Sequence, residues 1–223
     1  MDERRRAVLQ QRHLKKVTDH QLVKEQFTMI SIKLDDTLQQ IRACKLCEPH
    51  LPLGANPVIQ ASESSKLLII GQAPGVKVHN TSIPWNDPSG DRLRDWLELD
   101  NEQFYNREEI AIMPMGLCYP GKGKSGDLPP RKECAPQWHQ KVLSQLPNVG
   151  MTLLIGQYAQ NYYLQQKPAT LTETVRQWQR WTPHYLPLPH PSPRNTLWLK
   201  KNPWFEAEVL PYIRDYVHQH LKS

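Results

Sequence analysis

Four short apolar runs alternate with amphipathic stretches along this chain, and this alternation most limits the folds that it can adopt. The runs lie at residues 66–70, 110–115, 151–155 and 184–188. Runs without polar alternation are typical of strands that are buried on both faces, and strands separated by helices pair in parallel. The sequence therefore predicts an α/β fold, with a three-layer α-β-α arrangement and a central, mainly parallel, four-stranded sheet.

Helical spacing of apolar side chains fills the segments between these runs. It is found at residues 92–99, 134–146, 157–165, 172–180 and 204–221. We expect a single α/β domain over residues 41–223, preceded by an N-terminal extension over residues 1–40 that is partly helical or disordered. Apolar spacing improves after Met29, which favours a compact fold starting near that residue and makes Met29 a candidate for the natural start.

Charge and hydropathy exclude several classes of protein. The 223 residues include 28 Lys and Arg against 22 Asp and Glu, a formal charge of +6. No stretch approaches the roughly 18 apolar residues of a membrane helix, and the basic N-terminus lacks the apolar core of a secretory signal. We therefore expect a cytoplasmic monomer with no membrane partner. The charge permits a nucleic-acid partner but is too small to require one.

Four cysteines form the sharpest pattern. Cys44 and Cys47 make a C-x2-C pair, and Cys118 and Cys134 make a C-x15-C pair later in the chain. In a reducing compartment such cysteines favour a metal site over disulfides. Four thiolates suit either zinc or an iron–sulfur cluster. Zinc sites usually combine two close pairs, whereas this chain has one, and four unrelated reduced cysteines remain the alternative.

Two Pro-containing loops follow the first and the last predicted strand. The first is GQAPG at residues 71–75, and the second is HPSPRN at residues 190–195. Ligands of open α/β sheets bind at the carboxyl ends of strands, so these loops are the expected site. The first loop alone also fits an ordinary turn. In the second, two prolines hold His190 in a stiff frame, while Ser192, Arg194 and Asn195 suit phosphate contacts.

Together these pieces resemble the uracil-DNA glycosylase superfamily, and most closely its iron–sulfur branches, families four and five. GQAPG is similar to the first motif of that family, HPSPRN to the second, and the cysteine pattern to the ligands of its 4Fe-4S cluster. The resemblance covers about residues 40–220. It implies a DNA repair enzyme that flips a base out of DNA and hydrolyses its N-glycosidic bond, with a structural cluster. The base would be uracil or another deaminated or damaged base.

The resemblance transfers residue roles unevenly. His190 matches the histidine that hydrogen-bonds the departing base, and Trp85, after Pro84, matches an aromatic that stacks on uracil. Gln72 lies where family-four enzymes commonly have an acidic residue, Ala73 where the best-known branch has aspartate, and Pro114 where a base-reading asparagine is found. The expected catalytic residues are Gln72, Asp87 and His190; the expected base-binding residues are Gly71, Ala73, Pro74, Gly75, His79, Trp85 and Pro114; the expected DNA-binding residues are Lys122, Lys124, Arg131, Ser192, Arg194 and Asn195.

Three interpretations stay open at this point. Gln72 cannot act as a general base, so Asp87 is the first choice for a carboxylate, although Asp87 equally fits the start of a helix. The missing family groups at Ala73 and Pro114 keep a catalytically impaired DNA-binding relative as a second possibility. A four-cysteine zinc protein with an α/β fold and a small-molecule pocket is the third.

Overall fold

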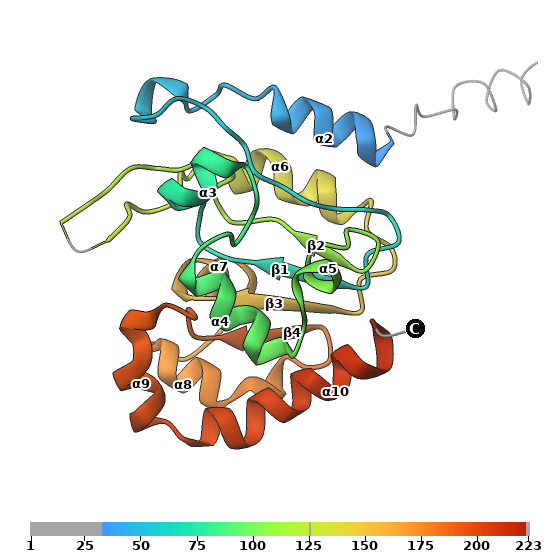
Figure 1. The fold of residues 1–223 in the computed structure, drawn as a ribbon, viewed down its shortest axis with the longest axis vertical. Coiled ribbons are helices and arrows are strands. Elements are labelled where there is room, and N and C mark those ends of the chain that lie inside the picture. The colour runs from blue at the N-terminus through green and yellow to red at the C-terminus, as the bar shows by residue number, and fades with distance from the viewer. Residues whose placement is uncertain (1–32, 125, 222–223) are drawn as a thin grey trace, which may run out of the picture. The chain divides into compact units, whose positions relative to one another are not determined.

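Four parallel strands form the centre of the fold in the computed structural model, which describes residues 33–124 and 126–221 (Figure 1). The strands are β1 (Leu67–Ile70), β2 (Ile110–Ile112), β3 (Met151–Ile155) and β4 (Tyr185–Leu188), and their order in the sheet is β2-β1-β3-β4. Leu67 of β1 pairs with Ile110 on one side and with Met151 on the other. The predicted four-stranded parallel sheet is confirmed.

Apolar side chains project from both faces of the sheet, as expected for strands whose sequences are continuously apolar. Leu67 and Ile69 join a core cluster that includes side chains of α4, α5, α8 and α10. Leu68 and Ile70 join a second cluster that includes side chains of α2, α6 and α7. The helices of these two clusters lie on opposite sides of the sheet in Figure 1, which gives the predicted three layers.

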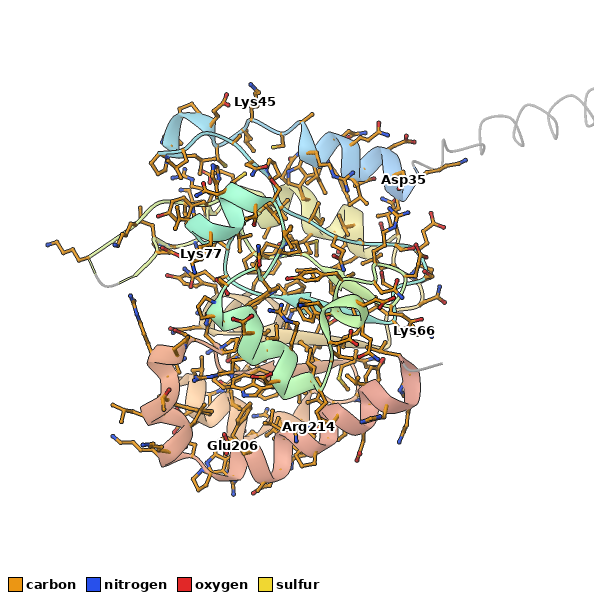
Figure 2. The ribbon with its side chains drawn as sticks, viewed as in Figure 1. Asp35, Lys45, Lys66, Lys77, Glu206 and Arg214 are labelled. Atoms are coloured by element: carbon orange, nitrogen blue, oxygen red, sulfur yellow. The ribbon has the colours of Figure 1, made fainter. Side chains whose placement is uncertain are left out.

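Helices α4, α6, α7, α8 and α10 overlap the five predicted helical segments with shifted ends, whereas α3, α5 and α9 lie outside them. The bounds of the described helices are α2 Leu34–Arg42, α3 Val76–Thr81, α4 Pro88–Leu97, α5 Asn101–Phe104, α6 Cys134–Leu143, α7 Gln157–Tyr163, α8 Leu171–Arg176, α9 Thr196–Lys201 and α10 Leu210–His220. Short 3-10 turns lie at Glu48–His50, Trp178–Arg180 and Pro193–Asn195, and a π-helical turn, Phe205–Val209, precedes α10. Charged side chains such as Asp35 and Glu206 extend from the outer surfaces of these layers (Figure 2). No helix among the described residues is long and apolar enough to cross a membrane.

Helix α2 crosses the expected domain boundary at residue 40. Its residues Leu34, Leu38 and Ile41 are buried against the second core cluster, so residues 34–40 pack with the α/β domain. Residues 34–223 form one compact unit. The rest of the expected extension, including Met29, lies outside the described residues.

Two segments differ from the prediction near the expected site. The run at 110–115 is a strand only over Ile110–Ile112, although Met113 and Met115 still donate to the Ile69 and Gly71 carbonyls. The segment before the helix expected at 92–99 contains α3, and α4 already begins at Pro88. Asp87 caps α4 through its side chain, and Pro88 takes the first helical position, where its missing N–H costs nothing.

Candidate active site and cysteine cavity

Both Pro-containing loops line a single cavity at the carboxyl ends of the strands. The cavity has a volume of about 620 Å³ and lies beyond the end of β1. In the sheet, β1 has β2 on one side and β3 on the other, so the order of the strands reverses there. Such reversal points of α/β sheets are where ligands bind, and the volume is typical of ligand sites. The predicted residues that line it are Gly71, Gln72, Ala73, Pro74, Gly75, Trp85, Asp87, Pro114, Lys122, His190, Ser192 and Arg194.

The absence of a side chain at Gly71 and at Gly90 leaves the space that Trp85 occupies at this cavity. A Cβ on Gly71 would lie 2.8 Å from Cζ2 of the Trp85 ring, and a Cβ on Gly90 would lie 1.7 Å from the Trp85 carbonyl oxygen. Real Cβ atoms do not approach other atoms so closely, so both positions require glycine. Trp85 itself has a φ of 57°, a left-handed conformation that costs free energy outside glycine and is typical of functional sites.

His190 lies next to Trp85, with 5.7 Å between the ring centroids. The side chain of Asn195 donates to the His190 carbonyl at 2.8 Å. Arg92 of α4 donates to the Ser192 carbonyl at 2.9 Å and to Thr196 Oγ1 at 3.3 Å. These two hydrogen bonds connect the second loop to α4. Burial lowers the pKa of His190, with Asp87 acting in the opposite direction. The imidazole is therefore neutral at pH 7 and has one N–H to donate.

Gln72 and Pro114 make structural contacts at the cavity wall. The Gln72 side-chain amide donates to the Leu128 carbonyl at 3.1 Å, so it holds the loop between Cys118 and Cys134 over the first motif. The Pro114 carbonyl lies 3.2 Å from Nε2 of the buried His139. Since a carbonyl only accepts, Nε2 carries the proton, and Nδ1 accepts from the Tyr163 hydroxyl.

Two carboxylates meet beside Gly75. Oδ2 of Asp87 lies 3.9 Å and Oδ2 of Asp127 lies 3.5 Å from the position that a Cβ on Gly75 would take. Asp87 Oδ1 accepts from the Gly90 N–H at 2.9 Å, so Asp87 caps a helix and also lines the cavity. The sequence did not indicate Asp127 as a site residue, because it lies in a Gly-, Pro- and Lys-rich loop between Cys118 and Cys134 that contains no recognisable motif.

Four predicted residues lie away from this cavity. The His79 ring contacts Tyr119, with 6.2 Å between the ring centroids, and Lys124 is exposed on its loop. The Asn195 side chain supports the backbone of His190. Arg131 lines the cysteine cavity and pairs with Glu133 at 2.6 Å, so it does not face the base site.

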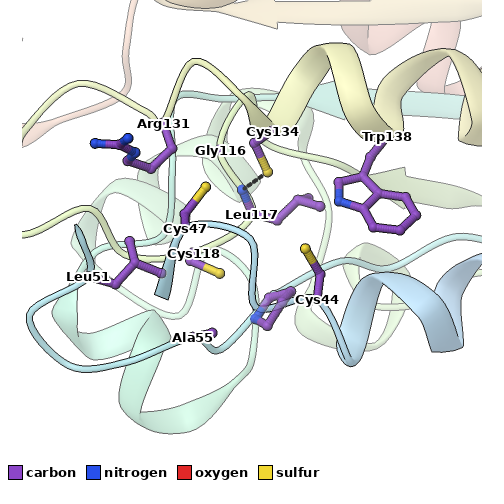
Figure 3. Close-up of a pocket in the computed structure, with 11 residues that line it drawn as sticks. Cys44, Cys47, Leu51, Ala55, Gly116, Leu117, Cys118, Arg131, Cys134 and Trp138 are labelled. Atoms are coloured by element: carbon purple, nitrogen blue, oxygen red, sulfur yellow. Dashed lines mark hydrogen bonds between the residues drawn. The ribbon is translucent and has the colours of Figure 1, made fainter. Parts of the chain in front are cut away.

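The four cysteines line a second cavity, together with Arg131 and Trp138 (Figure 3). All four are free thiols. The thiol of Cys134, the first residue of α6, accepts from the Leu117 N–H at 3.3 Å. The fold thus brings the C-x2-C segment next to the later pair, as the metal hypothesis requires. Over the described residues, no three His, Cys, Asp or Glu side chains are already arranged to hold a metal ion.

Burial and the charges of neighbouring cysteines keep the thiols of Cys118 and Cys134 protonated when no metal is bound. Burial raises the pKa of Cys118 to about 11 and that of Cys134 to about 12, and the charges of Cys44 and Cys47 add to both. A bound cation reverses this balance, since it stabilises thiolates and displaces their protons. Four converging thiols, one of which already accepts a backbone N–H, are a donor set that fits zinc or an iron–sulfur cluster.

Comparison with known protein families agrees with the observed fold. The sequence model described as "Uracil DNA glycosylase superfamily" matches residues 59–214. This match covers most of the chain, including both Pro-containing loops, and the chain belongs to that superfamily. Cys44 and Cys47 precede the matched region, so the match does not address the metal site.

Proposed function

We propose that this protein is a DNA glycosylase that removes uracil or another deaminated or damaged base from DNA. One observation carries the proposal. The first and second motifs, far apart in the sequence, line one cavity in which the Trp85 and His190 rings are neighbours. Membership of the superfamily supports this class of reaction and disfavours an unrelated α/β protein with a small-molecule pocket.

Base flipping is the first step of the mechanism. The enzyme turns the damaged nucleotide out of the helix at a cost of a few kcal/mol and places the base in the cavity. Trp85 provides an aromatic surface for the base, held in place by the lack of side chains at Gly71 and Gly90. Lys122, Ser192 and Arg194 line the same cavity, and their side chains are of the types that contact phosphates.

Cleavage then places negative charge on the departing base. The C1′–N bond breaks towards an oxocarbenium-like sugar, as in glycoside hydrolysis, and the bonding electron pair leaves with the base. Neutral His190 donates its N–H to that base, and one such fixed donor contributes about 3–4 kcal/mol to transition-state stabilisation. The rigid second loop keeps His190 aligned, because Asn195 and Arg92 both bind its backbone or that of its neighbours.

A hydrolytic water completes the reaction by adding to C1′. The Gln72 amide uses an N–H to hold the Leu128 carbonyl, so Oε1 is the atom left to accept a hydrogen bond from this water and orient it. Asp87 adds a carboxylate at the opposite side of the first motif.

The four cysteines are proposed to hold a structural 4Fe-4S cluster, with zinc as the alternative. Cys44, Cys47, Cys118 and Cys134 would bind it. Bound in this way, the cluster would crosslink the segment that contains Cys44 and Cys47 to the loop before α6. Hydrolysis of an N-glycosidic bond transfers no electrons, so the cluster has no place in the reaction. Anaerobic purification should give brown protein with iron and acid-labile sulfide, and Cys118→Ser should lose both. Stoichiometric zinc without iron would favour the alternative.

A lesion panel tests the proposed activity. Single- and double-stranded oligonucleotides with uracil, hypoxanthine or xanthine are incubated with the protein, and abasic sites are then cleaved with alkali. We expect cleavage at one or more lesions, and a loss of about 10²–10³-fold in His190→Ala. The exposed His184 provides a matched control, since His184→Ala should keep full activity. Absence of product on every lesion would refute the proposed glycosylase activity.

A catalytically impaired DNA-binding relative is the second candidate. Gln72 and Pro114 favour it, because neither supplies the carboxylate or the base-reading amide that the family commonly has at these positions. In that case the protein would bind lesion-containing DNA with steep salt dependence but release no base. The lesion panel combined with a binding titration separates the two candidates.

A further inference from the structure

Asp127, like Asp87, is a carboxylate at the cavity wall that neither motif contains. It lies in the loop between Cys118 and Cys134, where Lys122 and Asp127 face each other across an antiparallel bridge. The Gly123 N–H donates to the Gly126 carbonyl at 2.6 Å, and the Leu128 N–H donates to the Gly121 carbonyl at 2.8 Å. These bonds form a short hairpin that presents Asp127 at the cavity wall.

The first motif holds this hairpin in place. Gln72 donates to the carbonyl of Leu128, the residue directly after Asp127. Asp127 Oδ2 in turn lies 3.5 Å from the Cβ position of Gly75, at the other end of the same motif. The glutamine that lies where relatives commonly have an acidic residue therefore fixes the position of an acidic residue from another loop.

We propose that Asp127 is the general base of the glycosylase reaction, an inference that rests on the proposed function. Its carboxylate would accept a proton from the water whose oxygen attacks C1′. The C1′–N bond breaks, its electron pair leaves with the base, and the sugar keeps the hydroxyl. Asp127 then returns its proton to solvent and the departing base takes up one proton from solvent, so that one water has been added across the bond.

Asp127 is better suited to this role than Asp87. Asp87 Oδ1 already accepts from the Gly90 N–H and caps α4, so one of its two oxygens is engaged by the helix. The Asp127 side chain is exposed at the cavity wall, so water reaches it. Partial desolvation raises the pKa of Asp127, and Asp87 adds to this, while Arg194 and Lys122 oppose it. A carboxylate with a raised pKa is a stronger base.

Matched amide variants test the inference in the full-length protein. Asp127→Asn and Asp87→Asn each remove one charge, and asparagine at position 87 can still cap α4. Asp215→Asn, on the exposed surface of α10, is the control. Each variant is assayed for single-turnover release of the base that the wild type removes, and for binding to an oligonucleotide in which a 2′-fluorine on the sugar prevents cleavage.

We expect Asp127→Asn to slow release by about 100-fold or more, while binding stays within about threefold of the wild type. Asp127→Glu should recover part of the rate, and Asp215→Asn should match the wild type. Release within about threefold of the wild type in Asp127→Asn would overturn the inference and leave the glycosylase intact. Equal losses of release and binding would also overturn it, since Asp127 would then be a binding residue. A wild type that releases no base would overturn both.

Discussion

His139 provides a quantitative test of the structure around the base cavity. It is 1% exposed, in contact with Tyr163 on one side and with the Pro114 carbonyl on the other. Burial lowers its pKa to about 4, while the Pro114 carbonyl acts in the opposite direction. Protonation would place a charge in the core and remove the acceptor for the Tyr163 hydroxyl, so the folded protein holds His139 neutral.

The effect on stability follows from the difference between the folded and unfolded pKa values. An unfolded histidine titrates near 6.5, so as the pH falls below this value the unfolded state takes up a proton that the folded state refuses. Stability is therefore complete above pH 6.5 and decreases as the pH falls towards 4. Between pH 7 and pH 5, this single group costs about 2 kcal/mol of unfolding free energy.

His139→Gln isolates this contribution, since glutamine also has one donor and one acceptor but does not titrate. We expect the wild type to lose about 2 kcal/mol more than the variant between pH 7 and pH 5, measured by urea unfolding with tryptophan fluorescence. His184→Gln, at an exposed position, should behave as the wild type does. If His139→Gln loses as much stability as the wild type over this interval, then His139 is not held neutral by burial and the reasoning is wrong.

Three further substitutions probe how the cavity is held. Gly71→Ala would force the Trp85 ring to move, and we expect a loss of about 1–3 kcal/mol in stability together with weaker binding of lesion-containing DNA, measured by unfolding and titration. In Gly90→Ala the new Cβ would collide with the backbone carbonyl of Trp85 instead of with the edge of its ring. The loss of stability in Gly90→Ala should therefore exceed that in Gly71→Ala. Arg92→Ala removes the two bonds that tie the second loop to α4, and should slow base release about tenfold with an unchanged melting temperature, measured by single-turnover assay and calorimetry.

The sheet could be predicted because its four runs are apolar on both faces. The ends of β3 match the prediction, and β1 and β4 differ by one residue at their start. Helices with strong periodicity, such as α6, were also predictable. The short helices α3 and α9 were not, because six residues carry less than two turns of pattern and their apolar residues include exposed ones such as Val76 and Leu197.

The two motif loops could be placed from the sequence because each follows a strand, and parallel strands bring their carboxyl ends to one edge. What the sequence could not provide was the direction of side chains in the connecting segments. His79 and Asp87 are both close to the first motif, yet His79 contacts Tyr119 while Asp87 lines the cavity. Asp127 was missed for the same reason, since its position depends on a hairpin and on a bond from Gln72.

Gln72 and Pro114, two of the positions that depart from the family, share one feature, which is that each takes part in a hydrogen bond between a side chain and a backbone carbonyl. The Gln72 side chain holds the Leu128 carbonyl, and the Pro114 carbonyl is held by His139. Polar groups facing the cavity come instead from Asp87, Asp127 and Lys122, which belong to the segments around the motifs. Loss of a motif residue is therefore weak evidence for loss of catalysis in this chain, because the fold places a carboxylate beside the same loop.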